Sequence, residues 1–202
     1  MRRRSQIGHG IGMHDPWFFG YGSLVNRATH AHEDAHKATL TGWRRVWRHT
    51  ALRPVAFLTA VEVDGGEIDG LIARVPGADW RDLDERERAY DRVQAALVTH
   101  SGPRKLAVEV YTIPHGKHGA PDRAHPVLLS YIDVVVQGFL NEYGIDGVAR
   151  FFDTTDGWDA PIAFDRPDPI YSRHRVLSRK ERALVDQHLD EVGARYVEPP
   201  KF

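Results

Sequence analysis

The sequence contains no cysteine among its 202 residues. Disulfide bonds, a cysteine nucleophile and cysteine-ligated zinc are therefore excluded. Neither sign of charge dominates, because 27 Lys and Arg residues stand against 28 Asp and Glu residues spread along the chain. We therefore expect no broad basic face for nucleic acid or acidic lipid. A balanced surface of this kind suits a small zwitterionic substrate.

A long apolar run is also missing. The most apolar long segment, residues 127–140, is interrupted by three polar residues and is too short to span a bilayer. The chain begins Met-Arg-Arg-Arg, but residues 5–14 lack the apolar core of a signal peptide. We expect no membrane contact, a cytoplasmic location, a flexible arm over residues 1–15, and one domain over residues 16–202.

Periodicity predicts strands mainly in the first half of the chain and helices mainly in the second. The expected strands are 17–21, 38–50, 55–63, 68–75, 92–98 and 105–113, with a hairpin turn at 64–67. The expected helices are 79–90, 125–143, 146–152 and 178–192, the last opened by a capping box of Ser178 and Glu181. This order predicts an α+β domain, a small closed or nearly closed mixed β-barrel flanked by helices.

One expected helix carries a carboxylate on its apolar face. At 100° per residue, Trp80, Leu83, Glu87 and Tyr90 fall on the same side of residues 79–90. The other acids of this segment have a basic residue one turn away, whereas Glu87 has none within the helix. A partly desolvated carboxylate without a fixed cation binds protons more tightly, which suits a proton shuttle. Alternatively, Glu87 lies at the edge of the stripe and pairs with an Arg or a backbone group from elsewhere in the fold.

A second feature is the small-residue turn after the first expected strand. Residues 18–24 read Phe-Phe-Gly-Tyr-Gly-Ser-Leu. Such a turn presents backbone N–H groups with little side-chain cover, and Gly22 can adopt a positive φ without strain. The turn is therefore suited to hold a carboxylate or an oxyanion. On its own, the same composition also ends ordinary strands.

Taken together, these segments resemble the gamma-glutamylcyclotransferase superfamily, including its ChaC-like and AIG2-like branches. The resemblance rests on Gly-Tyr-Gly-Ser-Leu at 20–24, Gly-Trp-Arg-Arg at 42–45 and Leu-Asp-Glu-Arg-Glu at 83–87 with Tyr90 close behind, and it resumes at Pro126, Ser130, Tyr131, Gly138 and Glu142. It implies a small β-barrel with helices and a cofactor-free enzyme. The implied reaction releases 5-oxoproline from a gamma-glutamyl amide or peptide.

The resemblance also implies roles for individual residues. Glu87 matches the acid-base residue, and Tyr131 matches a substrate-facing Tyr. The positions that match the substrate-gripping loop are Tyr21, Gly22, Ser23 and Leu24.

Two departures from the ChaC-like pattern concern the substrate. Val25 and Asn26 stand where the ChaC-like glutathione enzymes usually carry an Ile or Met followed by Trp. Tyr90 follows Glu87 by three residues, where those enzymes usually show four. These departures argue against glutathione itself as the substrate.

The implied chemistry agrees with the residue types. The substrate's α-amine attacks its own γ-carbonyl, and such intramolecular attacks reach effective molarities on the order of 10⁵ M or more. No enzyme nucleophile is needed, and one carboxylate can serve both proton transfers. Backbone N–H groups of the turn would hold the α-carboxylate or the developing oxyanion.

Two other classes of function are consistent with parts of the sequence. His30, His32 and His36 have the spacing of metal ligands in a cupin-like barrel enzyme. Their segment shows no strand alternation, however, so we expect a solvated loop and no bound metal, and we expect the same of the Gly-rich loop with His115, His118 and His125. A non-catalytic small-molecule binding module of the same fold is the other alternative, and the presence of Glu87 argues against it. Assembly into a homo-oligomer and the identity of the departing group are left open.

Overall fold

The structure is a computed structural model that describes residues 15–50, 54–103, 106–114, 116 and 118–200. The expected N-terminal arm therefore lies outside the described residues, apart from Asp15. The Asp15 carboxylate accepts hydrogen bonds from Arg74 Nη1 at 2.9 Å and from the Gly77 N–H at 3.1 Å. In the described part of the chain, no helix is long and apolar enough to cross a membrane.

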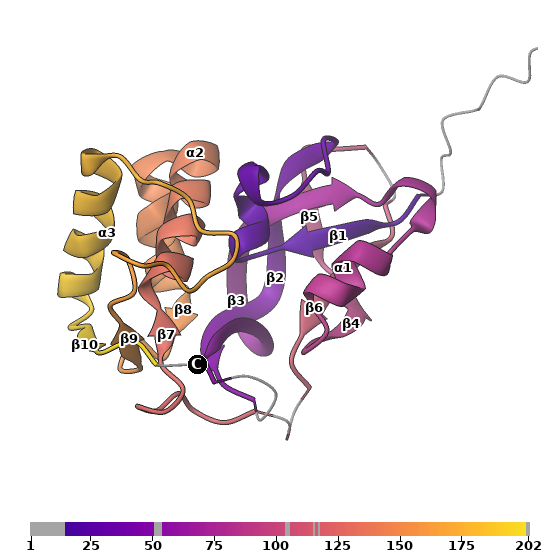
Figure 1. Ribbon diagram of the computed structural model, residues 1–202. Helices are drawn as coiled ribbons and strands as arrows, with labels where there is room; N and C mark the ends of the chain where they lie inside the picture. Colours follow the sequence, from indigo (N-terminus) through magenta and orange to yellow (C-terminus); the bar gives the residue numbers. More distant parts are fainter. Residues whose placement is uncertain (1–14, 51–53, 104–105, 115, 117, 201–202) are drawn as a thin grey trace, which may run out of the picture.

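The larger sheet has seven strands among the described residues, in the order β4-β6-β1-β3-β2-β5, with β8 paired to β2. The strands are β1 (Trp17–Gly20), β2 (Ala35–Arg48), β3 (Phe57–Arg74), β4 (Asp91–Gln94), β5 (Val98–His100), β6 (Val108–Thr112) and β8 (Thr155–Asp156). Strand β1 is antiparallel to β3 and parallel to β6, so the sheet is mixed. The long strands β2 and β3 curl strongly (Figure 1). The α+β class, with a nearly closed mixed sheet and flanking helices, is confirmed.

The expected hairpin turn at 64–67 is wrong, because β3 continues through it. Both halves of β3 pair with the same strand, β2: Trp43 lies opposite Glu62, and Thr41 lies opposite Glu67. The Asp-Gly-Gly segment therefore forms a bulge within one long strand. The chain reverses earlier, between β2 and β3.

Three α-helices are seen in the described ranges: α1 (Arg81–Arg86), α2 (Leu129–Asp153) and α3 (Arg179–Glu191). Helix α1 is shorter than the expected 79–90, because residues from Asp91 onward pair with β6 as strand β4. Helix α2 joins the two expected helices across Gly144, whose φ is 70°. The capping box of Ser178 and Glu181 at the start of α3 is confirmed.

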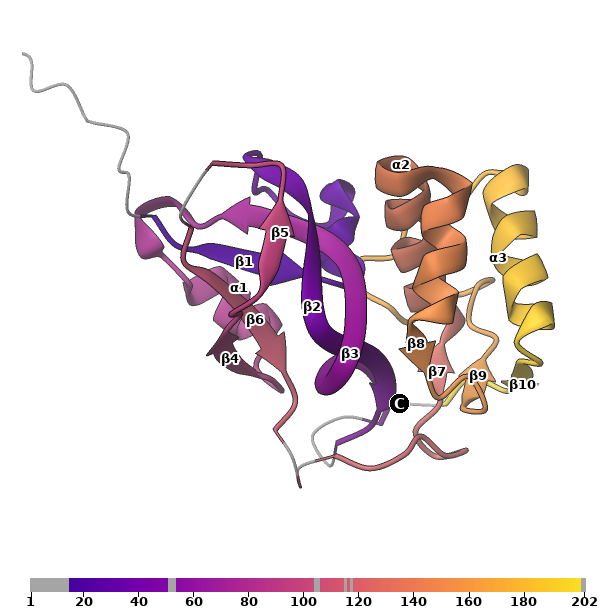
Figure 2. The ribbon, with the colours of Figure 1, turned by 180° about the vertical axis from the view of Figure 1, so that it is seen from behind.

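A second, smaller sheet accompanies the helices. It contains β7 (Val127–Leu128), β9 (Pro161–Ala163) and β10 (Arg195–Val197), in the order β10-β9-β7. Two opposite views place this sheet with α2 and α3 on one side of β2 and β3, and α1 with β4 and β6 on the other (Figures 1 and 2). Strand β1 points toward the helical side and is followed by two 3-10 turns, η1 (Ser23–Val25) and η2 (Arg27–Thr29). The Asn26 side chain donates to the Val134 carbonyl of α2 at 3.0 Å, so the turn after β1 is fastened to this helix.

Candidate functional site

A buried cation on β2 forms a hydrogen bond with the turn after β1. Arg45 of β2 is fully buried, and its Nε donates to the Tyr21 carbonyl at 2.8 Å. The Arg45 guanidinium lies 4.9 Å from the ring centre of Phe139 and 5.3 Å from that of Phe151 in α2. Burial lowers the pKa of Arg45 to about 9, so the side chain is still a cation at neutral pH. The turn backbone is thereby fixed between the sheet and α2.

Gly22 is required for a close approach to α2. Its φ is −126°, so the turn does not use the positive φ that a glycine permits. A Cβ at this position would lie 2.6 Å from Tyr131 Oη, which is closer than atoms can pack. The glycine thus lets the Tyr131 hydroxyl of α2 reach the turn.

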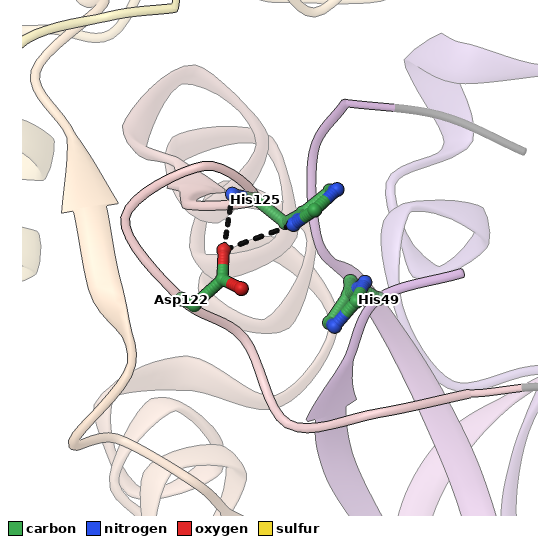
Figure 3. Close-up of side chains that lie close together, drawn as sticks. All are labelled: His49, Asp122 and His125. Carbon is green, nitrogen blue, oxygen red and sulfur yellow. Dashed lines mark hydrogen bonds and ion pairs between the residues drawn. The ribbon is translucent and has the colours of Figure 1, made fainter. Parts of the chain in front are cut away.

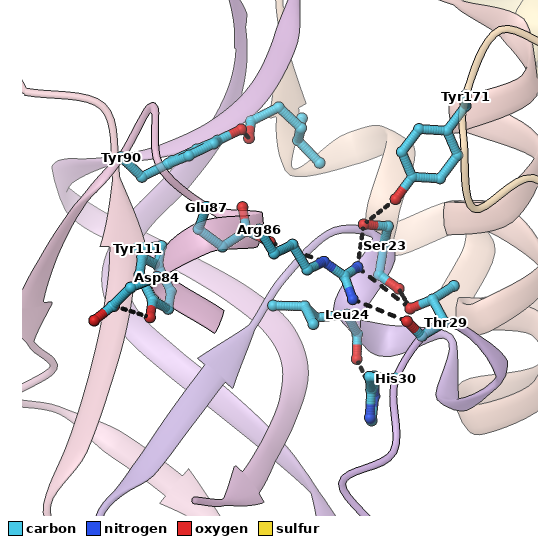
Figure 4. A network of polar contacts seen from close by, with 11 residues as sticks. Ser23, Leu24, Thr29, His30, Asp84, Arg86, Glu87, Tyr90, Tyr111 and Tyr171 are labelled. Carbon is cyan, nitrogen blue, oxygen red and sulfur yellow. Dashed lines mark hydrogen bonds and ion pairs between the residues drawn. The ribbon is translucent and has the colours of Figure 1, made fainter. Parts of the chain in front are cut away.

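Ser23 is the meeting point of three segments. Its Oγ accepts hydrogen bonds from Tyr171 Oη and from Arg86 Nη2, both at 3.0 Å (Figure 4). Arg86 also donates to the Thr29 carbonyl at 3.0 Å. Of the basic residues in this segment, Arg86 does not serve an acid one turn away in α1. Its guanidinium instead joins α1 to the turn after β1.

Glu87 lies directly after α1 and faces the same region (Figure 4). Its Oε1 is 3.1 Å from Arg86 Nε, and the side chains of Glu87 and Arg86 are 16% and 7% exposed. The expectation that no cation accompanies Glu87 is therefore wrong. Adjacent side chains diverge within a helix, but the Glu87 backbone leaves helical geometry at φ −101° and ψ 25°, which allows the two to meet.

Two tyrosines stand close to the Glu87 carboxylate. Burial raises the pKa of Tyr21 well above its usual range, and the charge of Glu87 raises it further. Burial also raises the pKa of Tyr131, with smaller contributions from Tyr171 and Glu87. Both phenols are therefore neutral at physiological pH and can donate hydrogen bonds. Tyr21 already donates to the Tyr111 carbonyl at 2.6 Å.

These residues border two hollows that share part of their lining. The smaller has a volume of about 30 Å³ and the larger about 450 Å³. Ser23, Glu87 and Tyr131 line both, whereas Tyr21, Gly22 and Leu24 line the smaller. The structure thus brings the other five sequence-predicted site residues together around Glu87.

The loop after β9 contributes residues that sequence analysis did not identify. Tyr171, Ser172 and Arg173 line the larger pocket. The base of this loop is fixed by Asp165, which is 1% exposed and accepts from the Ser130 N–H at 2.8 Å. The local sequence pattern of the loop does not indicate its contacts with Ser130 and Ser23, because these partners lie 35 or more residues away in the sequence.

The three imidazoles weighed as a metal site do not converge. Nε2 of His30 contacts the Leu24 carbonyl at 3.1 Å, and Nδ1 of His32 contacts the Arg74 carbonyl at 3.0 Å. Nε2 of His36 lies 3.0 Å from Asp34 Oδ1. These nitrogens point to separate partners. His30 instead supports the candidate site, because it holds the carbonyl of the turn residue Leu24.

A different set of possible metal ligands is His49, Asp122 and His125, whose ligand-type atoms lie within 4.8 Å of one another (Figure 3). The two rings stack at 4.2 Å with planes only 13° apart, so their in-plane lone pairs do not converge on one point. Asp122 Oδ1 is 2.9 Å from His125 Nδ1 and accepts from the His125 N–H at 2.8 Å. This arrangement is that of a hydrogen-bonded turn. The sequence also pointed to His115 and His118 in this loop. Of these two, His115 lies outside the described residues.

Comparisons with solved structures show the fold. YkqA from Bacillus subtilis matches with a TM-score of 0.54 and 19% identity, covering 67% of this chain and 52% of YkqA, so the chain spans about half of that protein. A structure titled gamma-glutamyl cyclotransferase matches with a TM-score of 0.56 and 13% identity over 86% of this chain and 99% of that one. The uncharacterized protein loc79017 from Homo sapiens matches with a TM-score of 0.56 and 13% identity over 85% and 98%.

A search of curated proteins finds no match. The family described as "Gamma-glutamyl cyclotransferase, AIG2-like" matches residues 18–129, which include the turn after β1, Arg86 and Glu87. The matched region also contains β2 to β6 and all but the first residue of β1, and with them most of the larger sheet. The chain therefore belongs to the AIG2-like gamma-glutamyl cyclotransferase family.

Proposed function

We propose that this protein releases 5-oxoproline from a gamma-glutamyl amide or peptide, with Glu87 as general acid and base. The observation that carries the proposal is the position of Glu87, which borders both the hollow at the turn and the larger pocket. A gamma-glutamyl group held against the turn would extend its departing group into the larger pocket. Membership of the family supports this class of substrate.

The reaction requires two proton transfers at neighbouring atoms. The α-amine nitrogen of the substrate forms a bond to the γ-carbonyl carbon and loses a proton to Glu87. The tetrahedral intermediate then collapses, the original C–N bond breaks, and the departing nitrogen takes the proton back from Glu87. The products are 5-oxoproline and a free amine. No metal, cofactor or enzyme nucleophile takes part.

The surrounding residues supply orientation and charge. Arg86 contacts one oxygen of Glu87 at 3.1 Å, which fixes the orientation of the carboxylate. In this proposal the neutral Tyr131 hydroxyl and the backbone N–H groups of the turn would stabilise the oxyanion or the α-carboxylate. The turn itself is rigid, because Arg45 and Arg86 hold it from two sides.

The test is an assay for 5-oxoproline with a panel of gamma-glutamyl amines, gamma-glutamyl dipeptides and glutathione. We expect product from compounds with a free α-amine, and none from the same compounds after α-N-acetylation, because the amine is the nucleophile. Glutamate released from an acetylated compound would show hydrolysis by water and would overturn the proposal. The absence of 5-oxoproline from every member, despite measurable binding, would favour the binding-module alternative.

A further inference from the structure

We propose that the larger pocket binds the departing group of the substrate, and that this group is an apolar amino acid whose free carboxylate is bound by Arg173. The inference rests on the proposed function, since it assumes that the gamma-glutamyl end of the substrate lies against Glu87 and the turn. It adds the chemical class of the departing group and a residue that determines specificity.

The wall of the pocket is mainly apolar. Its volume of about 450 Å³ falls within the range of small-molecule sites, about 300 to 1,000 Å³. Seven of its lining residues are aliphatic or aromatic hydrocarbons: Pro54, Val55, Ala56, Phe57, Ala89, Leu128 and Ile170. Two aromatic pairs add to this wall, since the Phe57 and Tyr90 rings meet edge to face, as do those of Tyr131 and Tyr171. A departing group with an apolar side chain would bury more apolar surface in this pocket than a polar one, and that burial favours binding.

The charged side chains that line the pocket favour an anionic ligand. They are Arg86, Glu87 and Arg173. Arg86 and Glu87 pair with each other at 3.1 Å. Arg173 makes no ion pair or hydrogen bond with the residues that the structure describes, so the pocket carries one uncompensated positive charge. A guanidinium binds a carboxylate through two parallel hydrogen bonds, whereas a cationic departing group would be repelled.

Arg173 stands on a backbone that is already fixed. Two residues before it, the Tyr171 N–H donates to Ser130 Oγ at 3.2 Å, and the Tyr171 hydroxyl reaches Ser23 at 3.0 Å. The Ile170 N–H donates to the buried Asp165 at 3.0 Å. The loop therefore joins the turn, where the gamma-glutamyl end would lie, to Arg173. Such preorganisation lowers the entropy lost when a substrate binds.

The inference is tested by comparing gamma-glutamyl-leucine with its C-terminal amide, in wild-type protein and in Arg173→Gln. In the wild type, we expect amidation to lower kcat/KM by about 10- to 100-fold, mainly through KM, because a hydrogen-bonded charge pair is lost. In Arg173→Gln, the acid should lose about the same factor and the amide almost nothing. An amidation effect of unchanged size in Arg173→Gln would overturn the inference and would place Arg173 elsewhere, for example at the α-carboxylate.

Two comparisons sharpen this test. Arg179→Gln removes the same charge from an exposed position at the start of α3, outside the pocket, and should leave both substrates unaffected. Gamma-glutamyl-leucine and gamma-glutamyl-phenylalanine should be used better than gamma-glutamyl-aspartate or gamma-glutamyl-lysine with the same backbone carboxylate. Equal use of all four would overturn the apolar assignment.

Calorimetry separates this inference from the proposed function. Binding of gamma-glutamyl-leucine and its amide can be measured directly with Glu87→Gln protein. One outcome is that the protein binds the acid more tightly than the amide, that this difference depends on Arg173, and that the wild type makes no 5-oxoproline. That outcome would support the subsite and overturn the proposed reaction. Equal release of 5-oxoproline from acid and amide would overturn the subsite and leave the reaction standing.

Discussion

Arg86 Nε lies 3.1 Å from Oε1 of Glu87, the next residue in the chain, and both side chains are largely buried. The same guanidinium donates to Ser23 Oγ and to the Thr29 carbonyl. One cation therefore links the candidate acid-base residue to the candidate substrate-binding turn. The charge of Glu87 is compensated locally, so its suitability for catalysis depends on its position and orientation.

The first prediction concerns Glu87→Gln. This nearly isosteric change removes the proton shuttle, and loss of a general acid-base group costs about 10² to 10⁴ in rate. We expect the upper end, because one carboxylate serves both transfers. The free energy of unfolding should fall by about 1–2 kcal/mol, less than the ~3–5 kcal/mol of an orphaned buried charge, because Arg86 keeps its contacts with Ser23 and Thr29. Assays of 5-oxoproline and denaturant melts measure the two effects.

Glu85→Gln is the matched control for this variant. The Glu85 side chain is 79% exposed and lies 3.5 Å from Arg88 on the outer face of α1. Its neutralisation should change neither activity nor stability measurably. A folded Glu87→Gln protein with the wild-type rate would remove Glu87 from the mechanism.

The second prediction is that turnover needs no metal ion. The nitrogens of His30 and His32 contact backbone carbonyls, and neither Glu87 nor the turn needs a metal for the proposed chemistry. Activity should survive exhaustive chelation and should persist in His32→Ala below its melting temperature. Loss of activity on chelation, followed by recovery with a divalent metal, would contradict this prediction.

The third prediction concerns stability in mild acid and depends on His30. Burial lowers the pKa of His30 to about 4, from about 6.5 in the unfolded chain. Nε2–H donates to the Leu24 carbonyl, and Nδ1 accepts from the His32 N–H at 3.2 Å, so a second proton would break the latter contact. Between these pKa values the unfolded chain binds the extra proton and the folded protein does not. The stability contributed by neutral His30 is therefore present above pH 6.5 and is lost as the pH falls toward 4.

Melts at pH 7 and pH 5 of wild type and His30→Asn measure this linkage. Other groups titrate in both proteins, so the difference between the two isolates His30. From pH 7 to pH 5 the wild type should lose about 2 kcal/mol more than the variant. Equal losses would show that His30 is protonated as easily in the folded protein as in the unfolded chain.

The sequence predicted the features that depend on local pattern. Strand alternation, helical periodicity and the Ser178 capping box gave the class of fold and the start of α3, because each is set by residues within one turn or one strand. The apolar stripe placed Glu87 against the interior, and the small residues at 20–24 located the turn. The family resemblance joined these two segments, which periodicity alone could not bring together.

Features that depend on distant partners were missed. Continuity of β3 through its glycines is imposed by pairing with β2 on both sides of the bulge. The ion pair of Arg86 with Glu87 depends on where α1 ends, and that end is set by pairing of β4 with β6. Tyr171 and Arg173 reach the pocket because Asp165 anchors their loop to the start of α2.

The fourth prediction tests the contact between the turn and α2 through Gly22 and Tyr131. A Cβ at position 22 would lie 2.6 Å from Tyr131 Oη and 3.3 Å from Leu58 Cδ2, so Gly22→Ala should destabilise the protein by about 1–3 kcal/mol through overpacking. Tyr131→Phe removes the closer of these atoms. In the double variant Gly22→Ala/Tyr131→Phe, the added methyl group should therefore cost at least about 1 kcal/mol less than in wild type. Denaturant melts of all four proteins give this coupling energy directly. Strictly additive losses would show that the Tyr131 hydroxyl does not limit residue 22, and the close packing of turn against helix would then have to be revised.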